Sequence, residues 1–167
     1  GIDTGDYTFD FDVMDTDAEA SDSITVSEES EGDASFGNIP PIGQGDIAVV
    51  PIQLENTDEA QVFMGYDDTG YNMSLEITDG DDDGQVVLQM NTYNVGRVTD
   101  KDADAQLIGT EDDTDSVTVT NVENAISDPP LAAAAYDVNV TSVDDKTTEY
   151  DVASLQITEP QINGLNS

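Results

Sequence analysis

The run DIAVVPIQL, residues 46–54, decides the fold class because it is rich in Val and Ile and is followed by turn-forming residues. β-Branched residues of this kind favour strands, and Pro51 within the run suits an edge strand. Five further runs have the same character: QVFMGY (61–66), QVVLQM (85–90), SVTVTNV (116–122), YDVNVTSV (136–143) and ASLQIT (153–158). Short strands between turn residues are typical of a β-sandwich, so the sequence predicts an all-β fold.

Strand-forming segments alternate with acidic turns along almost the whole chain. The run LAAAAY (131–136) is the best local helix candidate, but the prolines before it and the alternating YDVNV after it favour the start of a strand. We therefore expect strands and no amphipathic helix. The expected strands are 6–14, 22–27, 46–54, 60–66, 71–78, 84–93, 116–122, 135–143 and 150–158.

Acidic residues dominate the charge of the chain. It holds 38 Asp and Glu against Arg97, Lys101 and Lys146, which gives a formal net charge of −35. At low ionic strength the repulsion among these charges opposes compaction, whereas in molar salt the Debye length falls to about 3 Å and screens it. High net charge is also typical of disorder, but six strand-like runs favour an ordered chain. The composition therefore indicates a protein adapted to brine, with a surface that repels nucleic acid.

Several residue types and segments are absent from the sequence. Cysteine and histidine do not occur, so there is no disulfide, no thiolate metal site and no imidazole base. Acid–base chemistry would fall to pairs of carboxylates, and nothing singles out one pair. No apolar stretch approaches the roughly 20 residues of a membrane span, and no signal peptide precedes Gly1. We expect a mature or excised chain that is not an enzyme, needs no cofactor for chemistry and does not insert into membranes.

Two segments of the chain share one plan. GDYTFDFDVMDTDAEASDSITVSE (5–28) and AAYDVNVTSVDDKTTEYDVASLQITE (134–159) each contain a small residue, a Tyr, an alternating strand, an acidic turn and a second strand. In sandwich domains a Tyr near the start of a late strand often bonds back to the chain, forming a tyrosine corner. Tyr7 and Tyr136 have that placement. The alternative is that both are ordinary half-buried strand tyrosines.

This repeat predicts how the chain is divided. Residues 5–28 have the plan of a closing hairpin whose earlier strands are missing, whereas residues 34–160 have the plan of a complete domain. The N-terminal hairpin either ends a preceding domain or donates a strand to a neighbouring subunit. The expected parts are the hairpin (1–30), an acidic linker that leads into the sandwich (31–45), the β-sandwich (46–160) and a C-terminal tail (161–167).

The first strand of the hairpin is a candidate assembly strand. YTFDFDV alternates strictly, so that Tyr7, Phe9, Phe11 and Val13 share one face. Donation into the next subunit would bury these side chains, each contributing about 1.5–3 kcal/mol when fully buried. Repeated head to tail, such a contact is heterologous and produces an open filament.

From residue 34 onward the chain resembles the immunoglobulin-like domain of haloarchaeal surface-layer glycoproteins and related cell-surface proteins. The N-terminal GDYTFDFDVMDTDAEASDSITV (5–26) resembles the end of the domain that usually precedes it. The resemblance implies an immunoglobulin-like β-sandwich and a secreted structural role, although members of this family are usually longer and anchored. It is carried by GDIAVVPIQLENTDEAQVFMG (45–65), GYNMSLEITDGDDDGQVVLQMNTYNVG (70–96) and LAAAAYDVNV (131–140).

The acidic loop between two expected strands is a candidate cation site. Asp79, Asp81, Asp83 and Gly84 form D-x-D-x-D-G, the first half of a calcium loop of EF-hand type. The second half is missing, because Met90 occupies the position of the bidentate Glu. The loop either holds Ca²⁺ or another cation with help from other oxygens, or it is a hydrated hairpin tip.

Two N-glycosylation sequons occur, at Asn72-Met-Ser and Asn139-Val-Thr. Each asparagine lies in a strand-like run and is either a glycan acceptor or an unmodified surface residue. Both are compatible with a secreted protein.

Taken together, these features predict an extracellular structural protein of a halophilic archaeon. We expect it to self-assemble into a surface layer or filament by β-strand pairing, with cations between acidic surfaces as a further source of cohesion. Its partners would be copies of itself or neighbouring domains of a surface protein. The alternative is an adhesion or ligand-binding module that is displayed on a larger surface protein and does not assemble.

Overall fold

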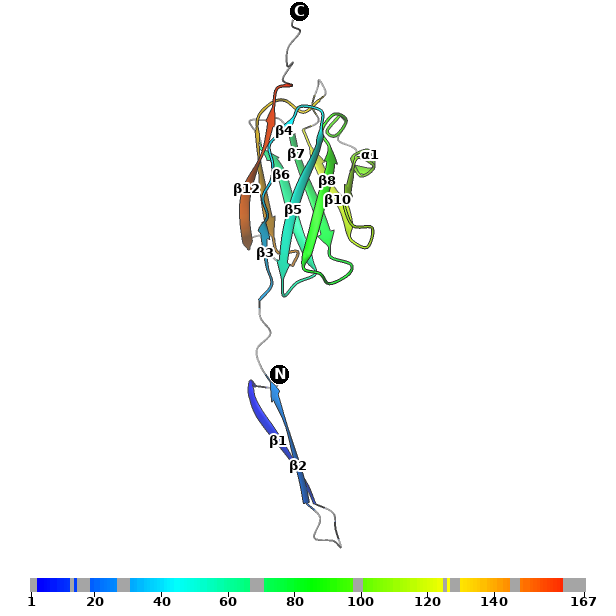
Figure 1. Cartoon of the computed structure of the whole chain (residues 1–167). Helices are drawn as coiled ribbons and strands as arrows, with labels where there is room; N and C mark the ends of the chain where they lie inside the picture. Colours follow the sequence, from blue (N-terminus) through cyan, green and yellow to red (C-terminus); the bar gives the residue numbers. More distant parts are fainter. Residues whose placement is uncertain are drawn as a thin grey trace, which may run out of the picture. The chain divides into compact units, whose positions relative to one another are not determined.

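A computed structural model describes most of the chain as strands in two compact units, Gly1–Glu31 and Gly32–Ser167 (Figure 1). The all-β prediction is confirmed. The residues that the structure describes are 3–12, 14, 19–26, 31–66, 71–97, 101–124, 126, 130–144 and 148–160.

The first unit is an antiparallel hairpin of β1 (Gly5–Asp12) and β2 (Glu19–Val26). Tyr7 lies opposite Ile24 in the ladder, and Phe9 lies opposite Asp22. Because side chains alternate along a strand and directly opposed residues share a face, the aromatic residues of β1 and Ile24 lie on one face, together with Asp22. The other face is polar, and there Thr25 Oγ1 donates a 2.7 Å hydrogen bond to Asp6 Oδ1.

The larger sheet of the second unit has six strands in the order β10-β7-β6-β11-β12-β4. All its neighbours are antiparallel except β12 and β4, which are parallel. Its strands are β4 (Ile42–Gly43), β6 (Glu59–Tyr66), β7 (Tyr71–Thr78), β10 (Ser116–Glu123), β11 (Ala135–Thr141) and β12 (Glu149–Thr158).

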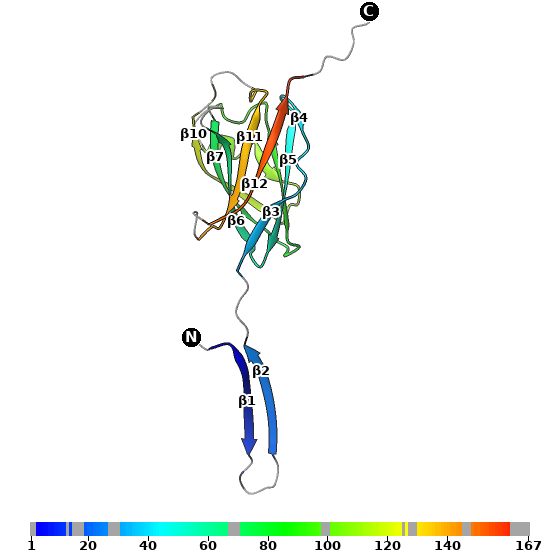
Figure 2. The ribbon, with the colours of Figure 1, turned by 90° about the vertical axis from the view of Figure 1, so that its left-hand side faces the viewer.

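The smaller sheet is antiparallel throughout and has the order β3-β5-β8-β9. The strand that holds Pro51, β5, therefore lies inside the sheet between β3 and β8, and the edge position that Pro51 suggested is wrong. The long strands of both sheets run between the same two ends of the unit (Figures 1 and 2). The strands of this sheet are β3 (Asp33–Phe36), β5 (Ile47–Glu55), β8 (Gln85–Asn91) and β9 (Ile108–Thr110).

One hydrophobic core joins the two sheets. Burial alternates with a period of two along β5, β7 and β8, as expected for strands with one face in the core. The smaller sheet contributes Ala48, Val50, Ile52, Leu54, Val86, Leu88 and Met90; the larger contributes Ala60, Val62, Met64, Tyr71, Met73, Leu75, Ile77, Tyr136, Val138, Val140, Leu155 and Ile157.

A single turn of helix, α1 (Lys101–Asp104), is attached to the core through a buried carboxylate. Asp104 accepts hydrogen bonds from the Tyr71 hydroxyl (3.2 Å) and from the Gly96 amide (3.1 Å). Burial, together with the adjacent Asp104 carboxylate, raises the pKa of the Tyr71 hydroxyl well above its usual value. Among the residues described, no helix is long and apolar enough to cross a membrane.

Each of the nine expected strands has a counterpart in the structure, with ends displaced by a few residues. Three strands were not expected, namely β3, β4 and β9, and each has four residues or fewer. Such short strands carry too little alternation to be distinguished from turns. Two of them lie within 31–45, the segment that we expected to be a linker. The expected C-terminal tail (161–167) lies outside the described residues.

Candidate functional site

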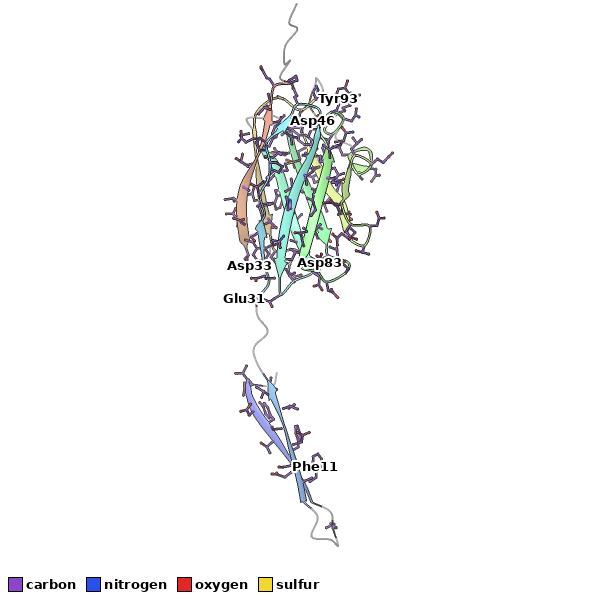
Figure 3. All side chains as sticks on the ribbon, viewed as in Figure 1. Phe11, Glu31, Asp33, Asp46, Asp83 and Tyr93 are labelled. Carbon is purple, nitrogen blue, oxygen red and sulfur yellow. The ribbon has the colours of Figure 1, made fainter. Side chains whose placement is uncertain are left out.

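The acidic loop connects β7 to β8 at one end of the second unit, where Figure 3 labels Asp83. Asp79, at the end of β7, is buried and directs its carboxylate back into the loop. Its Oδ2 accepts the Gly84 amide at 2.7 Å, and its Oδ1 accepts the Asp81 amide at 3.2 Å. Asp83 Oδ1 accepts the Gln85 amide at 2.8 Å. The loop is thus folded around its own carboxylates.

A second acidic loop, residues 111–115 between β9 and β10, lies against the first. The Gly80 amide donates to Asp115 Oδ1 at 3.2 Å, across 35 residues of sequence. At Gly80 a Cβ atom would lie 1.9 Å from the Thr114 carbonyl oxygen, so only glycine permits this approach of the two backbones. Gly80 therefore allows two acidic loops to meet.

Where the loops meet, three carboxylates form a cluster that can hold a metal ion. Asp79, Asp81 and Asp115 each offer one oxygen, and these oxygens lie within 4.8 Å of one another. Hard cations such as Ca²⁺ take several oxygen ligands, including carboxylates. Asp79 and Asp81 were expected as ligands from the sequence. Asp83 is not one of these three; it lines an adjoining open hollow with Asp112 and Asp115.

Asp115 was missed because its place in the cluster depends on a contact between distant loops. The run EDDTD (111–115) is acidic, but its spacing matches no known ligand pattern. Only the antiparallel pairing of β10 with β7 brings residue 115 next to residue 80. The sequence holds one indication of this contact: the acidic runs 79–83 and 111–115 border β7 and β10, the two strands that pair.

The carboxylates of the cluster have displaced pKa values. Burial alone would raise the pKa of Asp79, but backbone amides, led by that of Gly84, lower it below the usual range. Burial and then nearby carboxylates raise the pKa of Asp81. The pKa of Asp115 is also raised, first by burial and also by the charges of Asp79 and Asp112. Like charges are thus held together, and a bound cation would offset their repulsion.

The hairpin of the first unit presents an exposed apolar face, on which Figure 3 labels Phe11. Tyr7 is 37%, Phe9 48%, Phe11 58% and Ile24 54% exposed. These values are high for large apolar residues that share one face of a strand pair. Val13, the fourth residue of the expected assembly strand, lies outside the described residues.

Tyr7 and Tyr136 make the same local hydrogen bond. The Tyr7 hydroxyl donates to the Asp3 carbonyl oxygen at 2.7 Å, and the Tyr136 hydroxyl donates to the Ala132 carbonyl oxygen at 3.2 Å. Both bonds reach back four residues, as in a tyrosine corner. Tyr136 is fully buried, whereas Tyr7 is not.

The two sequon asparagines lie on strands of the larger sheet. Asn72 is in β7 and Asn139 is in β11, and both are half-buried between neighbours that point into the core. Asn139 Nδ2 donates to Glu149 Oε2 at 3.4 Å. Both side chains therefore lie on the face of the sheet that is turned away from the core.

An aromatic side chain is exposed at the other end of the second unit, where Figure 3 labels Tyr93 and Asp46. Tyr93 is 51% exposed, and the Arg97 guanidinium lies 5.6 Å from its ring centroid. This distance allows a cation–π interaction. Arg97 is also one of only three basic residues in the chain.

A two-sheet unit with an acidic loop cluster, together with an apolar hairpin, defines an all-β, strongly acidic protein. More specifically, the chain belongs to the family described as a domain of unknown function, DUF7827, whose family model matches residues 26–143. No solved structure shows a significant match to the chain.

The curated relatives are surface proteins of haloarchaea. Cell surface glycoprotein 2 of Haloarcula hispanica is 30% identical over 155 residues, which cover 88% of this chain and 17% of the relative. Cell surface glycoprotein 1 of the same organism is 28% identical over 153 residues, or 88% of this chain and 16% of the relative. The cell surface glycoprotein of Haloferax gibbonsii is 31% identical over 148 residues, or 84% of this chain and 16% of the relative.

The chain thus spans less than a fifth of the length of the curated relatives it matches. The resemblance to haloarchaeal cell-surface glycoproteins that the sequence predicts is confirmed.

Proposed function

We propose that this protein is an extracellular structural protein at the cell surface of a halophilic archaeon, where it assembles into a surface layer or filament. Assembly occurs by β-strand pairing between its hairpin and a neighbouring β domain, in another subunit or elsewhere in a surface protein. The exposed apolar face of β1 and β2 carries this proposal. The names of the relatives support the location, and the proposal assigns the chain no catalytic step.

We assign the second unit to the immunoglobulin-like class of β-sandwiches. Two mainly antiparallel sheets share one core, and Tyr136 at the start of β11 bonds back to Ala132. Both features are typical of that class.

The aromatic residues of β1 provide the apolar surface that pairing would bury. Phe9 and Phe11 are about half exposed in a protein whose surface is otherwise strongly charged. Full burial of a large apolar side chain contributes about 1.5–3 kcal/mol, and molar salt strengthens that contribution. A two-stranded hairpin is marginal in water, so packing against another sheet would also stabilise the hairpin itself.

Cations and glycans belong to the same proposal. A cation at Asp79, Asp81 and Asp115, with Asp83 beside them, would offset the repulsion between the two acidic loops and reduce it between neighbouring subunits. Asn72 and Asn139 would carry glycans on the outer face of the larger sheet. Because each asparagine is half-buried, a glycan attached to it would extend along the surface of the sheet.

A second candidate function is ligand binding by a displayed module that does not assemble. The exposed Tyr93 with Arg97 beside it favours this candidate, since an aromatic ring next to a cation suits a planar or anionic group. Replacing Tyr93 would abolish ligand binding but leave assembly unchanged.

The test compares association of the wild-type chain with that of two variants in molar NaCl. Phe9→Ser with Phe11→Ser removes the aromatic rings of the apolar face, and Thr8→Ala with Ser23→Ala is the control, which changes two residues of the polar face. We expect wild type and control to associate in sedimentation velocity and electron microscopy. The serine variant should associate at least roughly tenfold more weakly. A wild-type chain that stays a single particle at all concentrations would refute assembly through the hairpin.

A further inference from the structure

We propose that the hairpin is the closing strand pair of another two-sheet domain, one with the architecture of the second unit but without strands equivalent to β11 and β12. This inference rests on the proposed function, in which the hairpin pairs with a neighbouring β domain, and it names that neighbour. The neighbour is incomplete until β1 and β2 join its larger sheet.

The first observation is the shared tyrosine hydrogen bond. In each of the two hairpins a tyrosine hydroxyl near the start of the first strand donates to the carbonyl oxygen four residues earlier. Such a bond fixes the direction from which the chain enters the strand. In the second unit the entering strand is β11, which lies inside a complete sheet. The first unit reproduces this start without the sheet.

The second observation is that each tyrosine lies directly opposite an aliphatic residue of the following strand. Tyr7 lies opposite Ile24, and Tyr136 lies opposite Leu155. With these pairs superposed, every second residue of β1 corresponds to a core-facing residue of β11. Phe9 then takes the place of Val138, and Phe11 takes the place of Val140.

The third observation is the contrast in burial between equivalent positions. Val138 and Val140 are essentially inaccessible to solvent, as are Tyr136 and Leu155. Their counterparts in the first unit are 37–58% exposed. The same pattern of side chains is therefore a core face in one unit and a bare face in the other. What covers it in the second unit is the smaller sheet, with β6 as the hydrogen-bonded neighbour of β11.

The acceptor's pairing strand follows from the same register. In the second unit β11 pairs antiparallel with β6, so that Val138 lies opposite Met64 and Val140 opposite Val62. In the acceptor, β1 would pair with the strand equivalent to β6. Phe9 would lie opposite the Met64 position, and the larger sheet would continue from that strand into β1 and β2.

A second copy of this chain is disfavoured as the acceptor. Its place for a closing hairpin is already filled by β11 and β12. Displacing them would also put two phenylalanines where this core holds two valines, and close-packed interiors tolerate such enlargement poorly. The acceptor is therefore a domain of related architecture with more room opposite β1.

The alignments agree with an acceptor in the same polypeptide. The matches to the two Haloarcula relatives cover 88% of this chain, a share larger than the second unit alone. They therefore extend into the hairpin unit, and more than four-fifths of each relative lies outside the match. The unmatched part of each relative is long enough to contain further domains.

The experiment supplies an acceptor built from this chain's own sequence. Residues 32–130, which end before β11, are fused ahead of residues 2–167, so that the hairpin follows at the spacing of β11. Because the chain has no cysteine, Met64→Cys in the added segment and Phe9→Cys in the hairpin give a unique thiol pair. A short thiol cross-linker should join this pair within one molecule, and several-fold more efficiently than the register control, Ala60→Cys with Phe9→Cys.

A matched fusion carries Phe9→Val and Phe11→Val in the hairpin, which removes the difference in size between these two phenylalanines and the two valines of β11. We follow the unfolding of both fusions by circular dichroism in molar NaCl. The added segment should be more stable in the valine fusion than in the fusion that keeps Phe9 and Phe11. An added segment that stays unfolded with both hairpins overturns the inference, because a closing hairpin must complete its acceptor. A folded fusion that cross-links only in the control register overturns it as well.

The full chain alone separates this inference from the proposed function. When chains with Phe9→Cys are mixed with chains with Met64→Cys, we expect no cross-link between the two thiols, because β11 occupies the place beside β6 in every copy. Efficient cross-linking between copies would make the acceptor a second copy and overturn the inference, while assembly through the hairpin would stand. Absence of any association would instead refute the proposed function.

Discussion

At the scale of single residues, Asp79 accepts the backbone amides that close the loop from 79 to 84. A carboxylate that accepts several amides has its charged form stabilised, which is why the pKa of Asp79 is low despite burial. Its folded-state pKa lies below that in the unfolded chain. The stabilisation is therefore present above the unfolded value of about 4 and is lost as the pH falls through the folded value.

We expect Asp79→Asn to lower the free energy of unfolding by roughly 1–2 kcal/mol at neutral pH, because charge-assisted hydrogen bonds become neutral ones. The difference from wild type should shrink as the pH falls below about 4, because the unfolded chain then takes up a proton at residue 79 before the folded chain does. Urea unfolding in molar NaCl at several pH values measures it. Asp82→Asn is the control, because Asp82 is exposed and its left-handed backbone (φ 59°) tolerates Asn. Equal effects of the two substitutions at neutral pH would contradict the role of Asp79.

The residue scale is also where sequence-based prediction reached its limit. Asp79 and Asp81 could be proposed from spacing alone, since alternate aspartates before a glycine are a local pattern. Asp115 could not, because its contact with Gly80 spans 35 residues and depends on strand order. The same holds for Asp104, whose place in the core is set by Tyr71 and Gly96.

At the scale of elements, long strands were predictable because alternation over seven or more residues is a strong signal. β5, β7 and β8 show it plainly, and their burial follows it. β4 and β9 have two and three residues, and their existence depends on neighbours that supply hydrogen-bond partners. The pairing of sheets around one core likewise depends on contacts that no local pattern encodes.

The contact between the two acidic loops gives a prediction at this scale. Gly80→Ala would place a Cβ atom 1.9 Å from the Thr114 carbonyl, so the loops must separate. We expect destabilisation of about 1–3 kcal/mol, typical of overpacking, and loss of saturable Ca²⁺ binding by calorimetry in molar NaCl. Both effects follow because Asp115 moves away from Asp79 and Asp81.

Gly109→Ala is the matched control for that substitution, since a Cβ atom at Gly109 meets nothing within 4 Å. It should bind Ca²⁺ as the wild type does. Wild-type chain that takes up no Ca²⁺ would leave the cluster as hydrated acid and would contradict the cation part of the proposal. Unchanged binding in Gly80→Ala would show that Asp115 is not a ligand.

At the scale of the whole molecule, a net charge of −35 with three basic residues sets the response to salt. The Debye length falls from about 10 Å at 0.1 M to about 3 Å at 1 M, so repulsion across the surface is screened over that range. We expect the melting temperature to rise steeply between these concentrations and more gradually above them. Thermal unfolding by circular dichroism in NaCl and in KCl measures this, and both salts should act alike. A melting temperature independent of salt would contradict electrostatic control of stability.

The parallel pair of β4 and β12 has a consequence for how the second unit carries tension. The chain enters this unit at the end where Figure 3 labels Asp33, and β12 finishes at the opposite end (Figures 1 and 3). Near that finish, the Gln44 amide donates to the Thr158 carbonyl at 2.8 Å and Thr158 Oγ1 donates to the Ile42 carbonyl at 3.0 Å. A force that pulls apart the chain before Asp33 and the chain after Thr158 moves β4 and β12 in opposite directions along their length. The force then acts on these hydrogen bonds together in shear and does not open them one after another. The two-residue strand β4 thereby raises the resistance of the unit to mechanical unfolding.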